Sequence, residues 1–262
     1  MFRKLTIILI TVLISGLNAF AGSDGELIIK KNQPAEIKDC FESVNRVTFA
    51  FNQALDGAIF KPVASAYRVL PSPVKSGVSN SLENLSNLVT IPNNVLQGEF
   101  KKAGINSGRF VINTTVGILG FINVAEYLGF PEYEKEDYGQ SLATMGVGPG
   151  CYLVLPVLGP STVRDTTASI ANFVGGDAWY NVTVNNDTQY FSDFDYYASR
   201  VTSGVDFRAK NFDAIENLEQ NSIDFYASVK SLYLQDRQQK ILNTKKIIET
   251  QDDSDWEEIE TQ

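Results

Sequence analysis

Histidine is absent from this 262-residue chain, and tryptophan, methionine and cysteine each occur only twice. Without histidine the chain cannot build a Ser-His-Asp triad, a Cys-His pair or a histidine-ligated zinc site. Neither the GxxxxGK[ST] phosphate loop nor the GxSxG nucleophile elbow occurs in the sequence. These absences predict that the protein is not an enzyme and needs no cofactor.

Positive charge is also scarce, with 22 Lys and Arg against 31 Asp and Glu, for a net charge of −9. This balance disfavours nucleic-acid binding, because phosphate contacts need clustered basic residues. Adhesion to an anionic membrane by charge alone is disfavoured for the same reason. The acidic clusters around Glu134–Asp137 and Asp252–Asp255 lie in polar stretches, so we expect solvated charge and no metal site.

The longest apolar run lies at the N-terminus and has the pattern of a secretory signal. Arg3 and Lys4 precede the apolar residues 5–17, and Ala19-Phe20-Ala21 forms a small-residue cleavage site. We expect Sec export with cleavage after Ala21, and an uncleaved anchor is the alternative. The predicted organisation is a signal peptide (1–21), a polar linker (22–38), one helical domain (39–248) and an acidic, disordered tail (249–262).

Apolar residues recur at helical spacing through most of the central region, which predicts a mainly α fold. Asp39 and Glu42 form a capping-box-like pair at the start of the first helix. Ser72 is expected to cap a later helix and Asp213 a long one. The expected helices cover residues 74–85, 92–97, 100–115, 119–128, 191–205 and 214–242, with a loop over 131–137.

Residues 111–130 are mostly apolar but are interrupted by glycines, two asparagines and a glutamate. A bilayer-spanning helix needs about 20 predominantly apolar residues, which this stretch does not supply. Two shorter helices in succession fit better. They suit either the core of a soluble bundle or a position within one membrane leaflet.

The segment Tyr138–Asp165, YGQSLATMGVGPGCYLVLPVLGPSTVRD, is rich in glycine and proline around one apolar run. It predicts a hairpin-like turn over Met145–Gly150, a buried strand over Tyr152–Leu158 and a second turn at Gly159-Pro160. The residues alone indicate a shaped loop beside an apolar surface. A purely structural connection accounts for them equally well.

This segment resembles the MlaA (VacJ) family of bacterial outer-membrane lipid-asymmetry proteins. Further blocks that resemble the family are DCFESVNRVTFAFNQALD from Asp39, KPVASAYRVLPSPVKSGVSNSLENL from Lys61 and GRFVINTTVGILGFINVA from Gly108. Weaker echoes follow in GVDFRA and SIDFYASVKSLYLQDR. The likeness runs with gaps from Asp39 to Arg237, and its blocks stand in the family's order.

The resemblance implies a ring-shaped helical body embedded in the outer membrane, on its periplasmic side, with a short hairpin-like loop. It implies intermembrane phospholipid transport: misplaced phospholipids leave the outer leaflet and pass through an amphipathic channel to a soluble periplasmic carrier. The implied partners are phospholipid, that carrier and a trimeric outer-membrane porin. The chain lacks the family's usual lipidated cysteine near the cleavage site, so we expect attachment through the folded body.

Carried over to this chain, the family's mobile gating loop is Tyr138–Gly150. We expect Arg200, Asn45 and Arg164 to contact the lipid headgroup or the channel, although ion pairing with a carboxylate is the more usual role of an arginine among apolar neighbours. The same two alternatives, contact with a headgroup or an ion pair with a carboxylate, apply to Arg46, Arg109 and Arg208. The residues expected to allow or shape the loop's movement are Tyr138, Gly139, Met145, Gly146, Val147, Gly148 and Gly150.

Cys40 and Cys151 stand where the family commonly has proline. Both follow the expected signal peptide and would meet an oxidising compartment, so they form either a disulfide or two buried thiols. Two competing functions also stay open: a periplasmic binding or scaffold protein without transport, and a phospholipase that uses a histidine-free device.

Overall fold

A computed structural model describes residues 37–172, 177–184 and 191–242. The expected signal peptide (1–21), the acidic tail (249–262) and nearly all of the expected linker lie outside the described residues. The described elements are α3 (Glu42–Leu55), the π-helix η1 (Asp56–Phe60), α4 (Lys61–Arg68), α5 (Ser72–Leu96), α6 (Phe100–Thr115), α7 (Val124–Tyr127), α8 (Tyr138–Thr144), β1 (Tyr152–Leu155), β2 (Gly159–Thr162), α9 (Val163–Ala171), α10 (Ala178–Thr183), α11 (Asp193–Lys210), α12 (Phe212–Asn221) and α13 (Phe225–Leu242).

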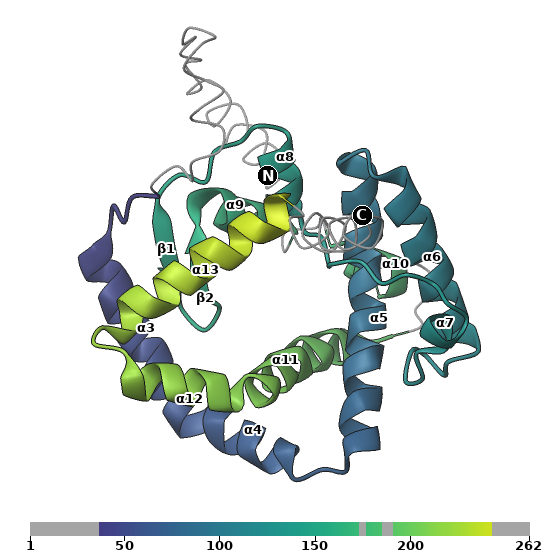
Figure 1. The fold of residues 1–262 in the computed structure, drawn as a ribbon, viewed down its shortest axis with the longest axis horizontal. Coiled ribbons are helices and arrows are strands. Elements are labelled where there is room, and N and C mark those ends of the chain that lie inside the picture. The colour runs from purple at the N-terminus through teal and green to yellow at the C-terminus, as the bar shows by residue number, and fades with distance from the viewer. Residues whose placement is uncertain (1–36, 173–176, 185–190, 243–262) are drawn as a thin grey trace, which may run out of the picture. The chain divides into compact units, whose positions relative to one another are not determined.

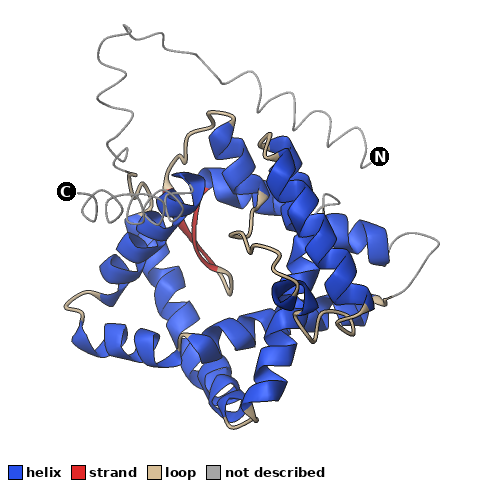
Figure 2. Cartoon of the chain, turned by 45° about the vertical axis from the view of Figure 1, so that its right-hand side comes forward, coloured by secondary structure: helices blue, strands red, loops and turns tan. Residues whose placement is uncertain are grey.

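From Ile37 onwards the elements are arranged around a ring, as the resemblance to the MlaA family implies (Figure 1). Helix α4 packs against α11, α11 against α5, and α5 against both α6 and α8. Helix α8 contacts α13, which joins α12, and α12 returns to α4. Figure 2 shows the antiparallel β1–β2 hairpin, in red, among the helices. No described helix is both long and apolar enough to cross a membrane.

Polar side chains fill the contact between α5 and α6. Asn106 donates to the Oδ1 of Asn94 at 2.9 Å, and Asn84 donates to Thr114 at 2.8 Å. Such hydrogen bonds hold helices together where an apolar contact gives little advantage, as inside a bilayer. The buried residues of the two helices are Gly77, Ser79, Asn84, Asn87, Thr90, Asn93, Asn94, Ala103, Asn106, Arg109 and Asn113.

Large apolar side chains lie instead on the outside of the helices, which reverses the usual distribution of a soluble protein. Phe41, Val44, Val47 and Phe51 expose more than half of their surface along α3 and its start. A second group surrounds the end of α6 and the turn after it: Val111, Val116, Ile118, Leu119, Phe121, Ile122, Tyr127 and Leu128. Exposed apolar area on this scale marks an interaction surface.

Several helix boundaries differ from the prediction. Two of the residues that we expected to cap a helix, Asp39 and Asp213, bind other side chains instead. Helix α3 begins at Glu42, and Asp39 does not cap it but accepts hydrogen bonds from tertiary neighbours. Asp213 pairs with Arg68, and the long helix expected after it is divided into α12 and α13. Ser72 is the first residue of α5, which continues through Pro92 as one helix.

The expected helix at 100–115 is confirmed as α6, whereas most of the expected 119–128 helix is a turn. Ile118 and Leu119 adopt positive φ angles of 54° and 56°, which ends the helical path. Gly120 follows with φ 90°, and an added Cβ would lie 2.5 Å from the side chain of Asn84. Only the short α7 remains helical in this stretch. The positive φ angles of residues 118–120 turn the backbone away from a helical path.

The hairpin also lies later in the chain than predicted. Its strands pair from Tyr152 with Thr162 to Leu155 with Gly159, so the connecting turn is 156–158. Gly159 and Pro160 belong to β2, and the expected strand over Tyr152–Leu158 ends at Leu155. The turn over Met145–Gly150 leads from α8 into this hairpin.

Candidate functional site

Helix α8 forms the first half of the expected gating loop, so Tyr138 and Gly139 are helical. Asp137 accepts from the backbone N–H of Gln140 at 3.0 Å, while the Gln140 side chain accepts from the N–H of Asp137 at 3.0 Å. This reciprocal capping box fixes the start of the helix. The sequence D-x-x-Q carried that signal, and our interpretation of the segment as one loop missed it.

Arg237 on α13 clamps the start of α8 to α9. Its guanidinium donates to Asp137 at 2.5 and 2.7 Å and to Asp165 at 3.0 Å through two nitrogens. Tyr233 and Arg164 also donate to Asp165, each at 2.9 Å. Burial alone would raise the pKa of Asp165, but the hydrogen bonds from Arg237 and Arg164 outweigh it and hold the pKa below its usual value.

Gly139 allows Arg237 and Asp165 to lie close to the backbone of α8. A Cβ at this position would lie 2.4 Å from both the Arg237 guanidinium and the Asp165 carboxylate. Any side chain here would therefore separate α8 from its partners. The structure gives Gly139 a role in close approach, where the sequence suggested freedom of movement.

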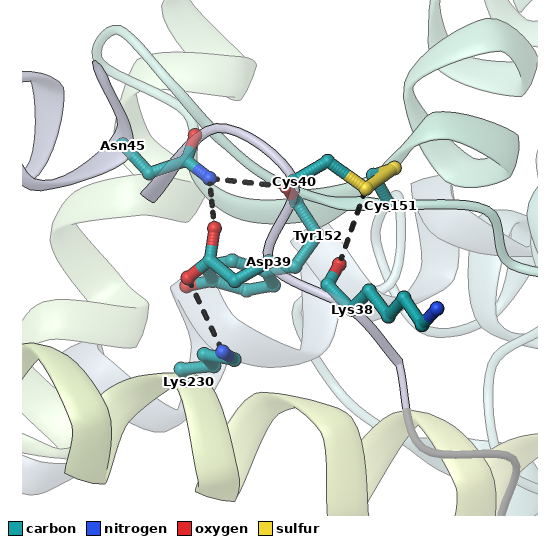
Figure 3. Close-up of a disulfide and its surroundings, with 7 residues drawn as sticks. All are labelled: Lys38, Asp39, Cys40, Asn45, Cys151, Tyr152 and Lys230. Carbon is teal, nitrogen blue, oxygen red and sulfur yellow. Dashed lines mark hydrogen bonds and ion pairs between the residues drawn. A yellow bond between two sulfur atoms is a disulfide. The ribbon is translucent and has the colours of Figure 1, made fainter. Parts of the chain in front are cut away.

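A disulfide between Cys40 and Cys151 fastens the start of β1 to the residues before α3 (Figure 3). The two Cα atoms are 5.6 Å apart, and 111 positions separate the cysteines in the chain. Beside the bridge, the N–H of Tyr152 donates to the carbonyl of Lys38 at 2.9 Å. The glycine-containing turn is therefore anchored covalently where it enters the hairpin.

Asp39 lies beneath the bridge and joins α3 to α13 (Figure 3). It accepts from Asn45 at 2.7 Å, from Lys230 at 3.2 Å and from the hydroxyl of Tyr226. Burial acts to raise its pKa, and these donors lower it more, so the carboxyl titrates below its usual range. The pKa of the Tyr226 hydroxyl is raised by burial and by its bond to Asp39.

Two asparagines on α3 bind the backbone of the hairpin as a third strand would. Asn45 donates to the carbonyl of Tyr152 at 3.0 Å and accepts from the N–H of Val154 at 2.9 Å. Asn52, two turns later on the same face, donates to the carbonyl of Leu155 at 2.9 Å and accepts from the N–H of Val157 at 2.8 Å. A carboxamide donates through its NH₂ and accepts through its oxygen, as a peptide group does.

Replacing these asparagines with leucine should therefore destabilise the hairpin unequally. N45L leaves buried peptide groups without partners and should cost about 2–4 kcal/mol, while N52L acts on a more exposed tip and should cost about 1–2 kcal/mol. Denaturant unfolding and amide exchange at Val157 measure both effects. Asn221, which is exposed at the end of α12, supplies the matched N221L control. Equal losses in all three variants would contradict the pairing.

Between these anchors, only short apolar turns extend outward. Met145 and Val147 are exposed before the hairpin, and Val157 and Leu158 are exposed at its tip. Val157 has φ 68°, which β-branched residues rarely adopt. Gly146 and Gly150 have φ angles of 90° and 69°, a region that favours glycine, whereas Gly148 has no neighbour near an added Cβ.

The residues expected at the lipid headgroup do not lie together. Asn45 is 2% exposed and both of its amide atoms are bound within the fold, which indicates a structural role. Arg164 is buried beside Asp165 and also donates to the carbonyl of Val147 at 3.5 Å. The geometry of Asn45 and Arg164 therefore favours a structural role over contact with a headgroup.

Arg200 lies elsewhere, on α11. It donates to Asp177 at 2.5 Å, and its guanidinium lies over the rings of Trp179 and Tyr196 at 5.3 and 5.1 Å. Its side chain is 46% exposed, so a contact with phosphate stays a prediction. The other three arginines bind groups within the fold. Arg46 pairs with Glu42 and Asp224, and Arg208 pairs with Asp56 and Glu216. Arg109 donates to the Phe130 carbonyl and to Asn123, and it pairs with Glu132.

Sequence reasoning missed Arg237 and Asn52, which hold the two ends of the segment. Asn52 is spaced seven residues from Asn45, a repeat that places both on one helix face. Arg237 gave no local signal, because its partners lie 72 and 100 positions away. Among the described residues no cluster of His, Cys, Asp or Glu could hold a metal ion.

Comparison with known proteins extends over the same region. Residues 37–240 match the family described as MlaA lipoprotein. The intermembrane phospholipid transport system lipoprotein MlaA of Haemophilus influenzae is 30% identical over 232 residues, with 84% of this chain and 85% of that protein covered. The protein of the same name from Escherichia coli strain K12 is 32% identical, with 75% and 76% covered.

A solved structure shares the fold as well. It is described as a structural basis for maintenance of bacterial outer membrane lipid asymmetry, and its chain is 30% identical with a TM-score of 0.66. The likeness covers 78% of this chain and 99% of the other. The ring of helices and the family match therefore agree, and this chain belongs to the MlaA lipoprotein family.

Proposed function

We propose that this protein maintains outer-membrane lipid asymmetry by intermembrane phospholipid transport. It removes phospholipids misplaced in the outer leaflet and passes them through an amphipathic channel to a soluble periplasmic carrier. The observation that carries this proposal is the reversed distribution of side chains, with asparagines inside and large apolar residues outside. The relatives named for phospholipid transport support it.

A phospholipid that leaves a bilayer carries a charged headgroup and two apolar chains. Its passage requires polar groups for the headgroup while the chains stay away from water, because burial of an unpaired charge costs far more than a hydrogen bond returns. The apolar exterior of the helices supports the second need, because it can lie among lipid chains, and the proposed channel would supply the first. The exposed apolar side chains of α3 and of residues 111–128 support a proposed position in one leaflet, on the periplasmic side of the outer membrane.

Attachment in this proposal depends on apolar burial, since the net charge of −9 does not favour an anionic surface. A trimeric porin and the periplasmic carrier are the proposed protein partners, by analogy with the family. Transport itself requires no catalysis, so the protein is proposed not to be an enzyme.

Complementation in a bacterium that lacks its own family member tests the proposal. Expression of this chain should restore a low amount of phospholipid in the outer leaflet. Continued exposure of phospholipid by a correctly localised protein would support the scaffold function instead. Release of lysolipid or fatty acid by the purified protein would support a phospholipase.

Gating in this proposal belongs to the turn Met145–Gly150, since the helix before it and the hairpin after it are anchored. Stiffening the turn with G148P should impair lipid removal severalfold and leave the unfolding midpoint nearly unchanged, because Gly148 has open space around it. Surface phospholipid measured in the complemented strain is the readout. The control is G104A, at a helical glycine that also has open space. Normal asymmetry in the stiffened variant would contradict gating by this turn.

A further inference from the structure

Residues 131–137 form an irregular strap between α7 and α8. Two hydrogen bonds of Glu136 fasten this strap to α5 and to the residue that follows α5. The backbone N–H of Glu136 donates to the hydroxyl of Thr90 at 3.4 Å, and its Oε2 atom accepts from the amide of Gln97 at 3.0 Å. The next residue, Asp137, is the N-cap of α8, so the strap ends where that helix begins.

The carboxyl group of Glu136 is buried, although the sequence predicted a solvated acidic cluster here. The residue is 3% exposed, and its Oε1 atom is buried without a hydrogen-bond partner among the described residues. An ionised carboxylate in this place would be a buried charge whose donor in the described structure is an uncharged amide, which costs far more than burial of a neutral carboxyl. Burial therefore raises the pKa of Glu136, and the hydrogen bond from Gln97 offsets this only in part.

The charged groups that face Glu136 from the neighbouring helices do not supply a free cation. Glu99 and Lys102 face it from the start of α6, and Asp137 faces it from the start of α8. Lys102 pairs with Glu99 at 2.6 Å, and Asp137 pairs with Arg237 at 2.5 Å. Two of the three groups are acids, and Lys102 is already bound to one of them. Their charges therefore do not remove the cost of ionising Glu136.

This buried carboxyl acquires a special place because the chain has no histidine, the side chain that ordinarily titrates between pH 5 and 8. Once ionised, the carboxylate needs water, which it reaches when the strap leaves α5. We propose that Glu136 is a pH-sensitive latch, which holds the strap on α5 while its carboxyl is neutral and releases the strap when the carboxyl ionises. Because Asp137 follows directly, release reaches the start of α8.

Release becomes easier as the pH rises. The carboxyl of a released strap titrates near the ordinary value of 4.5, whereas the pKa of the bound one is raised. The bound strap holds its proton more tightly, so the equilibrium constant for release rises by up to about tenfold per pH unit from about pH 4.5 to the pKa of the bound carboxyl, and then levels off.

Lys135, on the same strap, acts in the opposite direction. Its amine donates to the Oδ1 of Asn87 at 3.0 Å, and burial lowers its pKa. Release of the strap restores the charge of this amine and is therefore favoured at low pH. A release that grows with pH thus has the sign of Glu136 and not that of Lys135.

Amide exchange of the purified full-length chain in detergent, between pH 5 and 9, measures the release. Exchange in peptides that cover residues 131–141, corrected for the intrinsic effect of pH, gives the equilibrium constant for opening. In the wild type this constant should rise with pH. In E136Q, whose neutral carboxamide keeps the size of the side chain, it should not rise. The control E134Q removes an exposed acid of the same strap and should behave as the wild type does.

Q97L keeps the test decisive if E136Q fails to fold. It removes the hydrogen bond that lowers the pKa of Glu136, so the rise should continue to a higher pH than in the wild type. Equal pH profiles of the wild type and E136Q would overturn the latch. If E136Q does not fold, equal profiles of the wild type and Q97L would do the same. A wild-type constant that is independent of pH, or that falls as the pH rises, would also overturn it.

Only the consequence for transport rests on the proposed function. In the complemented strain, lipid removal should vary with external pH in the wild type and lose that dependence in E136Q. Equal pH dependence of removal in both, with release confined to the wild type, would overturn the link between the latch and transport. Release of the strap by a chain that fails in complementation would overturn the transport function and leave the latch in place.

Discussion

Replacing Cys40 and Cys151 with serine should lower the free energy of unfolding by about 4–5 kcal/mol. The bridge closes a chain segment of 111 positions, and a cross-link of that span removes much entropy from the unfolded chain. Urea unfolding of the oxidised wild type and of the double variant measures the difference. The melting temperature should fall with it.

The single variants C40S and C151S provide the control, because each breaks the same bond. Both should lose about as much stability as the double variant, and reductant should destabilise only the wild type. Two titratable thiols in the unfolded, unreduced wild type, with gel mobility unaffected by reductant, would show that the bridge does not form.

R237M should destabilise the protein by about 3–5 kcal/mol, since it leaves Asp165 buried without its main cation. The buried guanidinium joins α8, α9 and α13, so the variant should also loosen the start of α8. The matched control is R68M, whose partner Asp213 is largely exposed, and it should cost less than about 1 kcal/mol. Equal effects of the two variants would contradict the clamp.

The pH dependence of R237M provides a second test. In the wild type the pKa of Asp165 is lowered, so its contribution is complete above the unfolded value near 3.9 and is lost as the pH falls through the folded value. R237M removes the main group that lowers the pKa of Asp165, so this pKa should rise, and protonation then removes the buried charge. The stability gap between the two proteins should narrow from pH 7 to about pH 3, whereas a constant gap would exclude an electrostatic cause.

Local patterns predicted much of the fold, and they failed where a distant partner decided the local structure. The helix Phe100–Thr115 was predictable from its own residues. Asp39 has the sequence of an N-cap, yet Asn45, Tyr226 and Lys230 supply its hydrogen bonds. A residue that finds such tertiary donors does not need to cap the helix beside it.

Residues 138–165, which contain the proposed gating turn, show the same division. Glycine and proline marked residues 138–165 as an unusual element, and the D-x-x-Q cap was present in the sequence. Its anchors come from α3, from α13 and from a cysteine 111 positions away. Spacing along the chain carries no information on contacts of that range.

The sequence by itself determined the helical class, the absence of histidine chemistry and the resemblance to a lipid-transport family. Composition and periodicity suffice for these, because each depends on residue identity or on neighbours within a few positions. Only the tertiary structure decided that asparagines face inward, that apolar side chains face outward and that Arg237 closes the ring onto α8. A helical pattern gives two faces, and the packing of one helix on another selects which of them is buried.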